Sequence, residues 1–279
     1  MKRHFLITVF LSLIIIAGQA QSLRVATFNL RFDNKNDSGN LWKDRMKPVA
    51  NLIRFHDFDI VGVQEALVNQ LNDVSNALPE YALYGKGRDD GKTGGEHSSI
   101  FFKKDKYTLL NKGDFWLSET PDVPGKGWDV TCCNRITSWV YLQDKKSGKK
   151  FYVFNTHYDH QGQIARRESS KLILSKIKAI AGKDPAILTG DFNADRNSEP
   201  YQLLKNSALL HDSYHDVKYP YENNSSFNNF GRSIKQEGVI DHIFLTNQLK
   251  AFKWGILTDT YMGKYPSDHF PVMADVKWK

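Results

Sequence analysis

The stretch Ala186-Ile187-Leu188-Thr189-Gly190-Asp191-Phe192-Asn193 begins as a short apolar run and ends in an acid and an amide. The run over residues 186–189 predicts a buried strand with Asp191 just beyond it. A carboxylate beside an apolar strand is costly to bury unless something compensates its charge. On its own such an acid most often caps a turn or a helix. Whether Asp191 indicates a functional site therefore depends on whether similar groups accompany it.

Segments with acids, amides or histidines also accompany five other predicted strands. These segments are Thr27-Phe28-Asn29-Leu30-Arg31, Val63-Gln64-Glu65, Phe154-Asn155-Thr156-His157-Tyr158-Asp159-His160, Ile240-Asp241-His242 and Ser267-Asp268-His269-Phe270-Pro271. Each is weak evidence alone, because a lone acid or histidine is usually an ordinary surface or core residue. Several such groups that converge on one place are what a metal site requires. The collection therefore predicts one site at the strand ends.

The rest of the chain alternates predicted strands with helices and then adds further strands. The predicted strands cover residues 23–30, 58–63, 81–84, 98–103, 107–117, 137–142, 150–155, 186–189, 239–246, 252–257 and 270–278, and the predicted helices cover 43–55, 67–78 and 164–181. Two strand-rich halves, each with helices, favour the α+β class, with two sheets packed face to face and helices outside. No linker divides the chain, so we expect one domain over residues 21–279. The polar stretch 214–235 is predicted to be a surface loop near the site.

Residues 1–20 have the layout of a secretory signal peptide. Lys2 and Arg3 precede a run of apolar residues, and the small residues Gly18 and Ala20 stand just before a predicted cleavage point. The apolar run is too short to span a bilayer, and no other stretch reaches that length, so no stable membrane insertion is expected. The mature chain is expected to be exported, either to the periplasm or to the medium.

The composition excludes several classes of protein. Of the 279 residues, 41% are hydrophobic and 25% are charged, which supplies a full core and excludes intrinsic disorder. The two cysteines are too few for a disulfide scaffold or a cysteine-rich zinc module. Because Cys132 and Cys133 are adjacent, we favour two small buried thiols over a vicinal disulfide. The net charge of +7 permits a polyanionic partner but does not indicate one.

The predicted site is rich in hard oxygen donors. Glu65, Asp191 and Asp268 offer carboxylates and the asparagines offer amide oxygens, which suit Mg²⁺, Mn²⁺ or Ca²⁺. His157 and His269 are candidates to donate hydrogen bonds to a phosphoryl oxygen. Hydrolysis of a phosphate ester needs an activated water, charge neutralisation and help for the leaving oxygen. This set of residues contains candidates for all three.

The ordered motifs resemble the endonuclease/exonuclease/phosphatase superfamily, which includes deoxyribonuclease I, apurinic endonucleases, sphingomyelinases, inositol polyphosphate phosphatases and deadenylases. Gly190-Asp191-Phe192-Asn193 and Ser267-Asp268-His269-Phe270-Pro271-Val272 carry most of the resemblance, and Thr27-Phe28-Asn29 and Gln64-Glu65 precede them in the expected order. The resemblance covers nearly the whole mature chain and includes a secreted bacterial subgroup. It implies a four-layered α/β sandwich, deoxyribonuclease I-like, with the active site at one end of the two sheets.

The resemblance also implies a metal centre. Glu65 would be the principal metal ligand with Asn29 beside it, and Asp268 would lie close to the metal and bind it directly or through water. The implied cofactor is a divalent cation, Mg²⁺ ahead of Mn²⁺ or Ca²⁺.

The catalytic roles follow from the same resemblance. Asp191 would position or deprotonate the attacking water, and Asn193 would orient Asp191 and contact the phosphate. His269 would stabilise the charged transition state, and Asp241 would orient that histidine. His157 would be a second contact to the phosphate.

Four more residues are candidate contacts to the substrate. Arg31 would either bind an extra or terminal phosphate or pair with a neighbouring carboxylate. Asp159 would orient the nearby histidine, approach the metal, or cap the following helix. Arg88 and Arg135, like Glu96, fall in or near predicted loops, where solvated surface charge is the alternative.

These features favour an exported, divalent-metal-dependent phosphoesterase that hydrolyses a phosphomonoester or phosphodiester by in-line attack of water. A small-molecule, lipid or sugar phosphate ranks ahead of nucleic acid, because the sequence has no dense cluster of Lys and Arg for a nucleic-acid groove. The alternatives are a secreted nuclease of the deoxyribonuclease I type and a catalytically inactive binding module on the same fold. The sequence leaves the substrate, the metal and the oligomeric state open.

Overall fold

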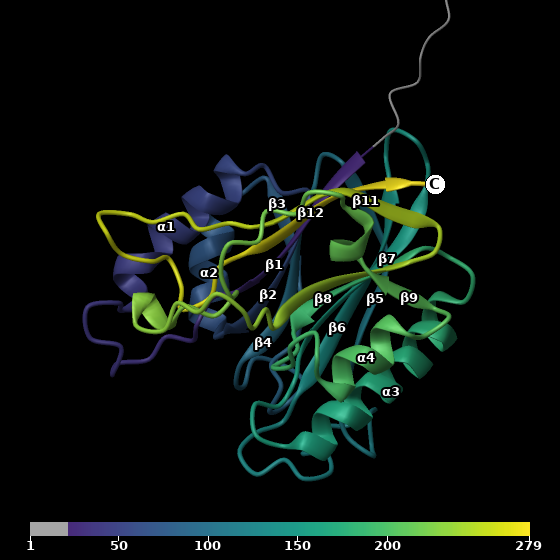
Figure 1. Cartoon of the computed structure of the whole chain (residues 1–279), viewed down its shortest axis with the longest axis horizontal. Helices are drawn as coiled ribbons and strands as arrows, with labels where there is room; N and C mark the ends of the chain where they lie inside the picture. The colour runs from purple at the N-terminus through teal and green to yellow at the C-terminus, as the bar shows by residue number, and fades with distance from the viewer. Residues whose placement is uncertain (1–21) are drawn as a thin grey trace, which may run out of the picture.

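The strands of the protein form two six-stranded sheets that pack against each other (Figure 1). The computed structural model describes residues 22–279, so the predicted signal peptide over residues 1–20 lies outside the described residues. The strands are β1 Ser22–Asn29, β2 Ile60–Ala66, β3 Tyr81–Tyr84, β4 His97–Lys103, β5 Tyr107–Trp116, β6 Ile136–Asp144, β7 Lys150–His157, β8 Ala186–Asp191, β9 Leu210–Asp212, β10 Asp241–Thr246, β11 Leu249–Ile256 and β12 Val272–Trp278.

Both sheets are mixed. One has the strand order β11-β12-β1-β2-β4-β3, and the other has the order β5-β6-β7-β8-β10-β9. In the first sheet β1 runs parallel to β2, and in the second β7 runs parallel to β8. The other neighbouring pairs are antiparallel. The carboxyl ends of the four parallel strands meet at one end of the sandwich, away from the C-terminus, since the start of β1 pairs with the end of β12.

The helices cover the outer faces of the two sheets. They are α1 Trp42–Phe55, α2 Val68–Ala77, α3 Gln163–Ala181 and α4 Glu199–Lys205, with 3-10 helices over Ser213–Asp216 and Asn229–Gly231. Figure 1 shows α1 and α2 beside the sheet that contains β1, and α3 and α4 beside the sheet that contains β8. The order helix, sheet, sheet, helix confirms the predicted four-layered sandwich. Within residues 22–279, none of the helices is long and apolar enough to cross a membrane.

The central strands are apolar on both faces because each is covered on both sides. Val25, Ile60 and Ile187 are buried between the sheets. Their neighbours along the strands face outward, where Val61 packs in the cluster under α1 and α2 and Leu188 in the cluster under α3 and α4. This double burial explains why these strands appear in the sequence as continuous apolar runs.

Every predicted strand and helix is present, and the bounds differ by at most about three residues, as is usual for element ends. Two elements were not predicted, the helix α4 and the strand β9. Both are too short for a periodic pattern to be recognised. The stretch 214–235, predicted as a loop, contains most of one 3-10 helix and all of another.

A buried asparagine joins the two sheets. Asn155 on β7 donates from Nδ2 to the carbonyl oxygens of Val63 and Ser99 in the opposite sheet, both at 2.9 Å. Its Oδ1 accepts from Gln64 Nε2 at 2.6 Å and from Thr189 Oγ1 at 3.1 Å. The side chain is fully buried, so all of its hydrogen-bonding groups depend on these partners.

We predict that Asn155→Ala lowers the free energy of unfolding by about 2–5 kcal/mol, because it leaves buried carbonyl and amide groups without partners. Urea denaturation followed by circular dichroism measures the change. Asn111→Ala is the matched control, since Asn111 lies exposed on β5. Equal stability of the two variants would contradict a structural role for the link between the sheets.

Candidate active site

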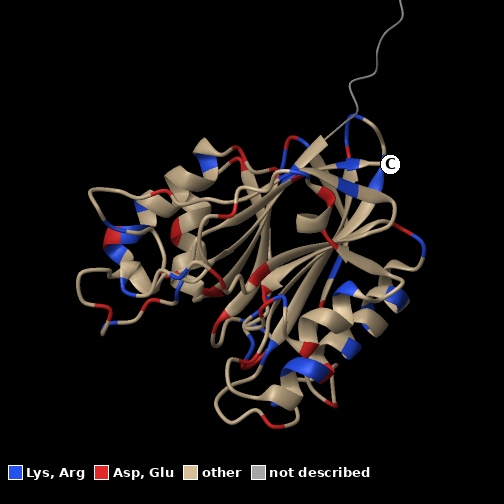
Figure 2. Cartoon of the chain, viewed as in Figure 1, with Lys and Arg blue, Asp and Glu red and all other residues tan. Residues whose placement is uncertain are grey.

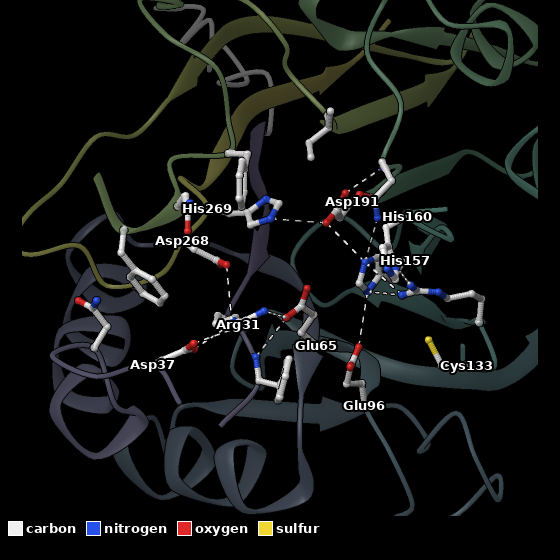
Figure 3. Close-up of a pocket in the computed structure, with 18 of the residues that line it drawn as sticks. Arg31, Asp37, Glu65, Glu96, Cys133, His157, His160, Asp191, Asp268 and His269 are labelled. Carbon is white, nitrogen blue, oxygen red and sulfur yellow. Dashed lines mark hydrogen bonds and ion pairs between the residues drawn. The ribbon is translucent and has the colours of Figure 1, made fainter. Parts of the chain in front are cut away.

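The polar residues at the strand ends surround one cavity of about 500 Å³ (Figure 3). It opens at the end of the sandwich where β1, β2, β7 and β8 finish. The lining residues include Arg31, Asp37, Glu65, Arg88, Glu96, Cys133, Arg135, His157, His160, Asp191, Asn193, Phe227, Phe230, Asp268 and His269. The predicted convergence of separate motifs on one place is therefore present in the fold.

Asn29, at the end of β1, links an acid from each sheet. Its Nδ2 donates to Glu65 Oε1 and to Asp191 Oδ2, both at 3.0 Å. Its Oδ1 accepts from the backbone N–H of Arg31 at 2.9 Å. The assignment of Asn29 as a metal ligand beside Glu65 stays a prediction. In the structure Asn29 acts as a donor that holds two carboxylates in place.

Three carboxylates lie buried or half-buried around this centre. Burial, with the negative charge of Asp241, raises the pKa of Asp191 to about 7. Burial also raises the pKa of Asp268 to about 6, with a contribution from the charge of Glu65. Carboxylates with raised pKa values are carboxylates whose negative charge is incompletely compensated. A divalent cation would provide that compensation.

The donor set fits a hard divalent cation. Ligand atoms of Glu65, His157 and Asp191 lie within 4.8 Å of one another, and Asp268 is a further buried carboxylate on the same cavity. Carboxylate oxygens are the ligands that Mg²⁺, Mn²⁺ and Ca²⁺ prefer. Glu65, His157 and Asp191 could therefore hold an ion together, with Asp268 as a further carboxylate on the cavity.

His269 is held by two acids. Its Nδ1 lies 2.9 Å from Asp241 Oδ2, and its Nε2 lies 3.7 Å from Asp191 Oδ2. Burial alone would lower the pKa of His269, but the negative charges of Asp241 and Asp191 outweigh that effect and raise it to about 10. The ring is therefore an imidazolium at neutral pH. Such a buried cation can bind a phosphoryl oxygen.

His157, unlike His269, is uncharged. Burial and the nearby positive charges of Arg135 and Arg88 lower its pKa well below the ordinary value, so the ring is neutral. Its Nε2 lies 3.2 Å from Asn193 Nδ2 and 3.5 Å from Asp191 Oδ2. The backbone N–H of Asn193 donates to Asp191 Oδ1 at 2.9 Å. Asn193 therefore holds both neighbours, in agreement with the orienting role predicted for it.

Three site residues occupy left-handed backbone conformations, which residues other than glycine rarely adopt. The φ angles are 57° at Arg31, 64° at Glu65 and 46° at Asn193. Glu65 lies where the pairing of β2 with β4 shifts register. Such conformations cost about 1–3 kcal/mol each and persist where the surrounding structure fixes them, often at functional sites. The sequence gives no sign of them.

Arg31 lies among carboxylates. Its Nε is 2.9 Å and its Nη2 3.1 Å from the two carboxylate oxygens of Asp37. Glu65 and Asp268 are 3.9 Å and 3.8 Å away. Of the two alternatives for Arg31, pairing with a neighbouring acid is the one present in the structure. Asp37 was missed as a site residue, because its segment was interpreted as a polar turn.

Asp159 does not line the cavity. Its Oδ1 accepts from the backbone N–H groups of Gln161 and Gly162 at 2.9 Å and 2.6 Å, and its Oδ2 lies 3.3 Å from Arg135 Nε. The assignment of Asp159 as a substrate contact is therefore corrected. It anchors the turn before α3 and holds Arg135, which does line the cavity and contacts His157 at 3.2 Å.

Arg88 and Glu96 form a second pair on the cavity wall. Two hydrogen bonds of 2.5 Å and 2.9 Å join the guanidinium to the carboxylate. Burial and the charge of Glu65 raise the pKa of Glu96 to about 7. Both side chains are largely shielded from solvent. The alternative of solvated surface charge is thus wrong for this pair.

The cysteines also differ from the expectation. Cys132 and Cys133 are joined by a disulfide, and Cys132 is exposed while Cys133 is half-buried and lines the cavity. The preference for two buried thiols is wrong because this segment runs over the rim of the site and not through the core. The predicted loop 214–235 does lie beside the site, where Phe227, Phe230 and Arg232 line the cavity.

The fold and these residues together define a phosphoesterase of the deoxyribonuclease I-like architecture. Residues 26–269 match the Endonuclease/Exonuclease/phosphatase family. An endonuclease/exonuclease/phosphatase family protein from Bacteroides thetaiotaomicron is 46% identical, with a TM-score of 0.90 over 94% of this chain and 99% of that chain. The chain therefore belongs to the endonuclease/exonuclease/phosphatase family and is a phosphoric ester hydrolase.

Two further proteins are similar to this chain. A mannosyl-6-phosphatase from Bacteroides thetaiotaomicron is 45% identical, with a TM-score of 0.89 over 92% of this chain and 100% of that chain. Nocturnin from Drosophila melanogaster is 28% identical over 65% of this chain, and the match spans 32% of that longer protein.

We predict that Glu65→Gln weakens the binding of Mn²⁺ by at least about tenfold, because it removes a charged oxygen ligand. Isothermal titration calorimetry of the protein with Mn²⁺ measures the affinity. Glu80→Gln is the matched control, because Glu80 pairs with Arg54 on the surface, outside the cavity. If Glu65→Gln bound Mn²⁺ as tightly as the control, Glu65 would not be a ligand.

Proposed function

We propose that the protein is a metal-dependent phosphomonoesterase that acts on a sugar phosphate. The observation that carries this proposal is the cluster of Glu65, Asp191 and Asp268 beside the charged His269, in one cavity. The cluster is suited to hold a cation and a phosphate and to activate water. The 45% identity over nearly the whole chain with a mannosyl-6-phosphatase supports a sugar phosphate as the substrate.

The shape and charge of the site favour a small substrate. The cavity of about 500 Å³ is within the range of sites for small ligands. Three of its four arginines, Arg31, Arg88 and Arg135, each lie within 3.3 Å of a carboxylate, and Arg232 is the fourth. Figure 2 shows Lys and Arg scattered over the ribbon and interspersed with Asp and Glu. A nuclease would need a continuous basic surface for the nucleic-acid backbone.

The chemistry divides between the ion and the side chains. A divalent cation held by Glu65 and Asp268 would neutralise phosphate charge and stabilise the leaving oxygen. The Asp191 carboxylate accepts the proton of the attacking water at Oδ2, where Asn29 fixes its orientation. The backbone N–H of Asn193, which donates to Asp191 Oδ1 at 2.9 Å, leaves Oδ2 as the oxygen for that task.

The two histidines have separate tasks at the phosphate. His269 supplies a fixed positive charge for a phosphoryl oxygen, and Asp241 on its far nitrogen sets the direction of the ring. His157 is neutral and donates or accepts one hydrogen bond without adding charge. Asn193 positions His157 and Asp191 together.

We predict that purified protein hydrolyses mannose 6-phosphate with Mg²⁺ or Mn²⁺ and that EDTA abolishes this activity. Phosphate release is measured beside generic diesters, plasmid DNA, RNA and sphingomyelin. Asp191→Asn is expected to lower kcat by about 10²–10⁴-fold, the usual contribution of a general base. Asp105→Asn, an exposed acid outside the cavity, is the control. Chelator-sensitive nicking of plasmid without release of phosphate from sugars would contradict the proposal.

We also propose that residues 1–20 direct export and are removed. The charged start, the apolar run and the small residues before Gln21 support this proposal. N-terminal sequencing of protein expressed in a bacterial host with intact secretion is expected to begin near Gln21. Recovery of full-length protein from the cytoplasm alone would contradict it.

A further inference from the structure

The two sides of the cavity carry different charge. On one side the guanidinium of Arg31 faces three carboxylates, those of Asp37, Glu65 and Asp268, at 2.9, 3.9 and 3.8 Å. One positive group among three negative groups leaves a formal charge of −2. That side is suited to a divalent cation.

The opposite side carries no net charge. Arg88 is paired with Glu96, and Arg135 with Asp159, so each guanidinium is matched by one carboxylate. His157, between the two sides, is neutral. Figure 3 shows Glu96, Cys133, His157 and His160 together on this side, across the cavity from Arg31 and Asp37.

We propose that Arg88 and Glu96 form a subsite that binds neighbouring hydroxyl groups of the sugar that carries the phosphate. In this Arg88–Glu96 subsite, Glu96 accepts a hydrogen bond from one hydroxyl and Arg88 donates to the next. The inference rests on the proposed function, because it assigns the part of the substrate that is not phosphate.

An uncharged diol is the substrate group that matches the hydrogen-bonding groups of this subsite. A carboxylate only accepts and a guanidinium only donates, whereas a hydroxyl does both. Two adjacent hydroxyls can therefore satisfy an acceptor beside a donor. A second phosphate would instead need cations that are free of carboxylates, and it would meet the negative charge of Glu96.

The subsite lies next to a predicted phosphate contact. Glu96 Oε2 is 3.9 Å from His157 Nδ1, which is the predicted contact to phosphate. The backbone N–H of Arg88 also donates to the backbone carbonyl oxygen of Glu96 at 3.0 Å, which joins the two residues at the main chain. The sulfur of Cys133 provides a less polar surface beside it, suited to the C–H groups of a sugar ring.

Kinetics with two substrates test the subsite. In Glu96→Gln, kcat/KM for mannose 6-phosphate is expected to fall about 10- to 100-fold, the usual effect of losing a hydrogen bond to a charged group. For phenyl phosphate, which has no such hydroxyls, it is expected to stay within about threefold. Asp105→Asn is the control, because Asp105 is an exposed acid that does not line the cavity.

Two kinetic results would overturn the inference. An equal fall for both substrates would place Glu96 at the phosphate or the metal, and no change for either would show that it contacts no substrate. Thermal denaturation of the variants verifies that both are folded, and Gln at position 96 retains a hydrogen-bond acceptor for Arg88.

A binding measurement separates this inference from the proposed function. Saturation-transfer NMR with methyl α-mannoside, which has no phosphate, requires no turnover. The wild-type protein and Asp105→Asn are expected to give a signal that Glu96→Gln loses. Absence of signal from the wild type, or an unchanged signal in Glu96→Gln, would overturn the subsite. Failure to hydrolyse any sugar phosphate, with the NMR result intact, would overturn only the proposed function.

Discussion

The amide nitrogen of Asn29 holds one carboxylate from each of the two sheets, and the rest of the site depends on this contact. It lies 3.0 Å from both Glu65 and Asp191. Two carboxylates this close repel each other unless a donor or a cation stands between them. The backbone oxygen of Asn29 also accepts from Ser267 Oγ at 2.6 Å, which brings the segment with Asp268 and His269 to the same point.

The surrounding fold is built to keep this arrangement rigid. Arg45 of α1 is fully buried, and its Nη1 donates to the carbonyl oxygens of Leu30 and Pro266 at 2.7 Å and 2.8 Å. It thereby ties together the two loops that follow β1 and precede β12. Asn155 makes a similar connection deeper between the sheets. Polar groups that are fully satisfied in this way specify one arrangement of a buried site.

The motifs in the sequence predicted the architecture and most of the acids and histidines that line the cavity. Glu65, Asp191, Asp268 and His269 were recognisable because acids and histidines that end apolar strands are unusual in such number. The contacts of the Asn29 amide nitrogen with Glu65 and Asp191 were not predicted, because a sequence does not show which atom of an amide faces a carboxylate.

Other errors have similar physical causes. Asp37 was missed because its pairing with Arg31 depends on the fold of a turn, and the turn residues look ordinary. Asp159 was placed in the substrate pocket, but the turn before α3 uses its carboxylate. The state of Cys132 and Cys133 could not be predicted, since it depends on a surface path that no periodic pattern records.

The central claim is that the buried acids at the strand ends exist to hold a divalent cation beside His269. Anomalous X-ray diffraction from crystals grown with Mn²⁺ tests it most directly. We expect one strong anomalous peak in contact with Glu65, on the Arg31 side of the cavity. A peak at Cys132, Asp159 and His160, the separate group of potential ligands at the rim, with none at Glu65, would contradict it.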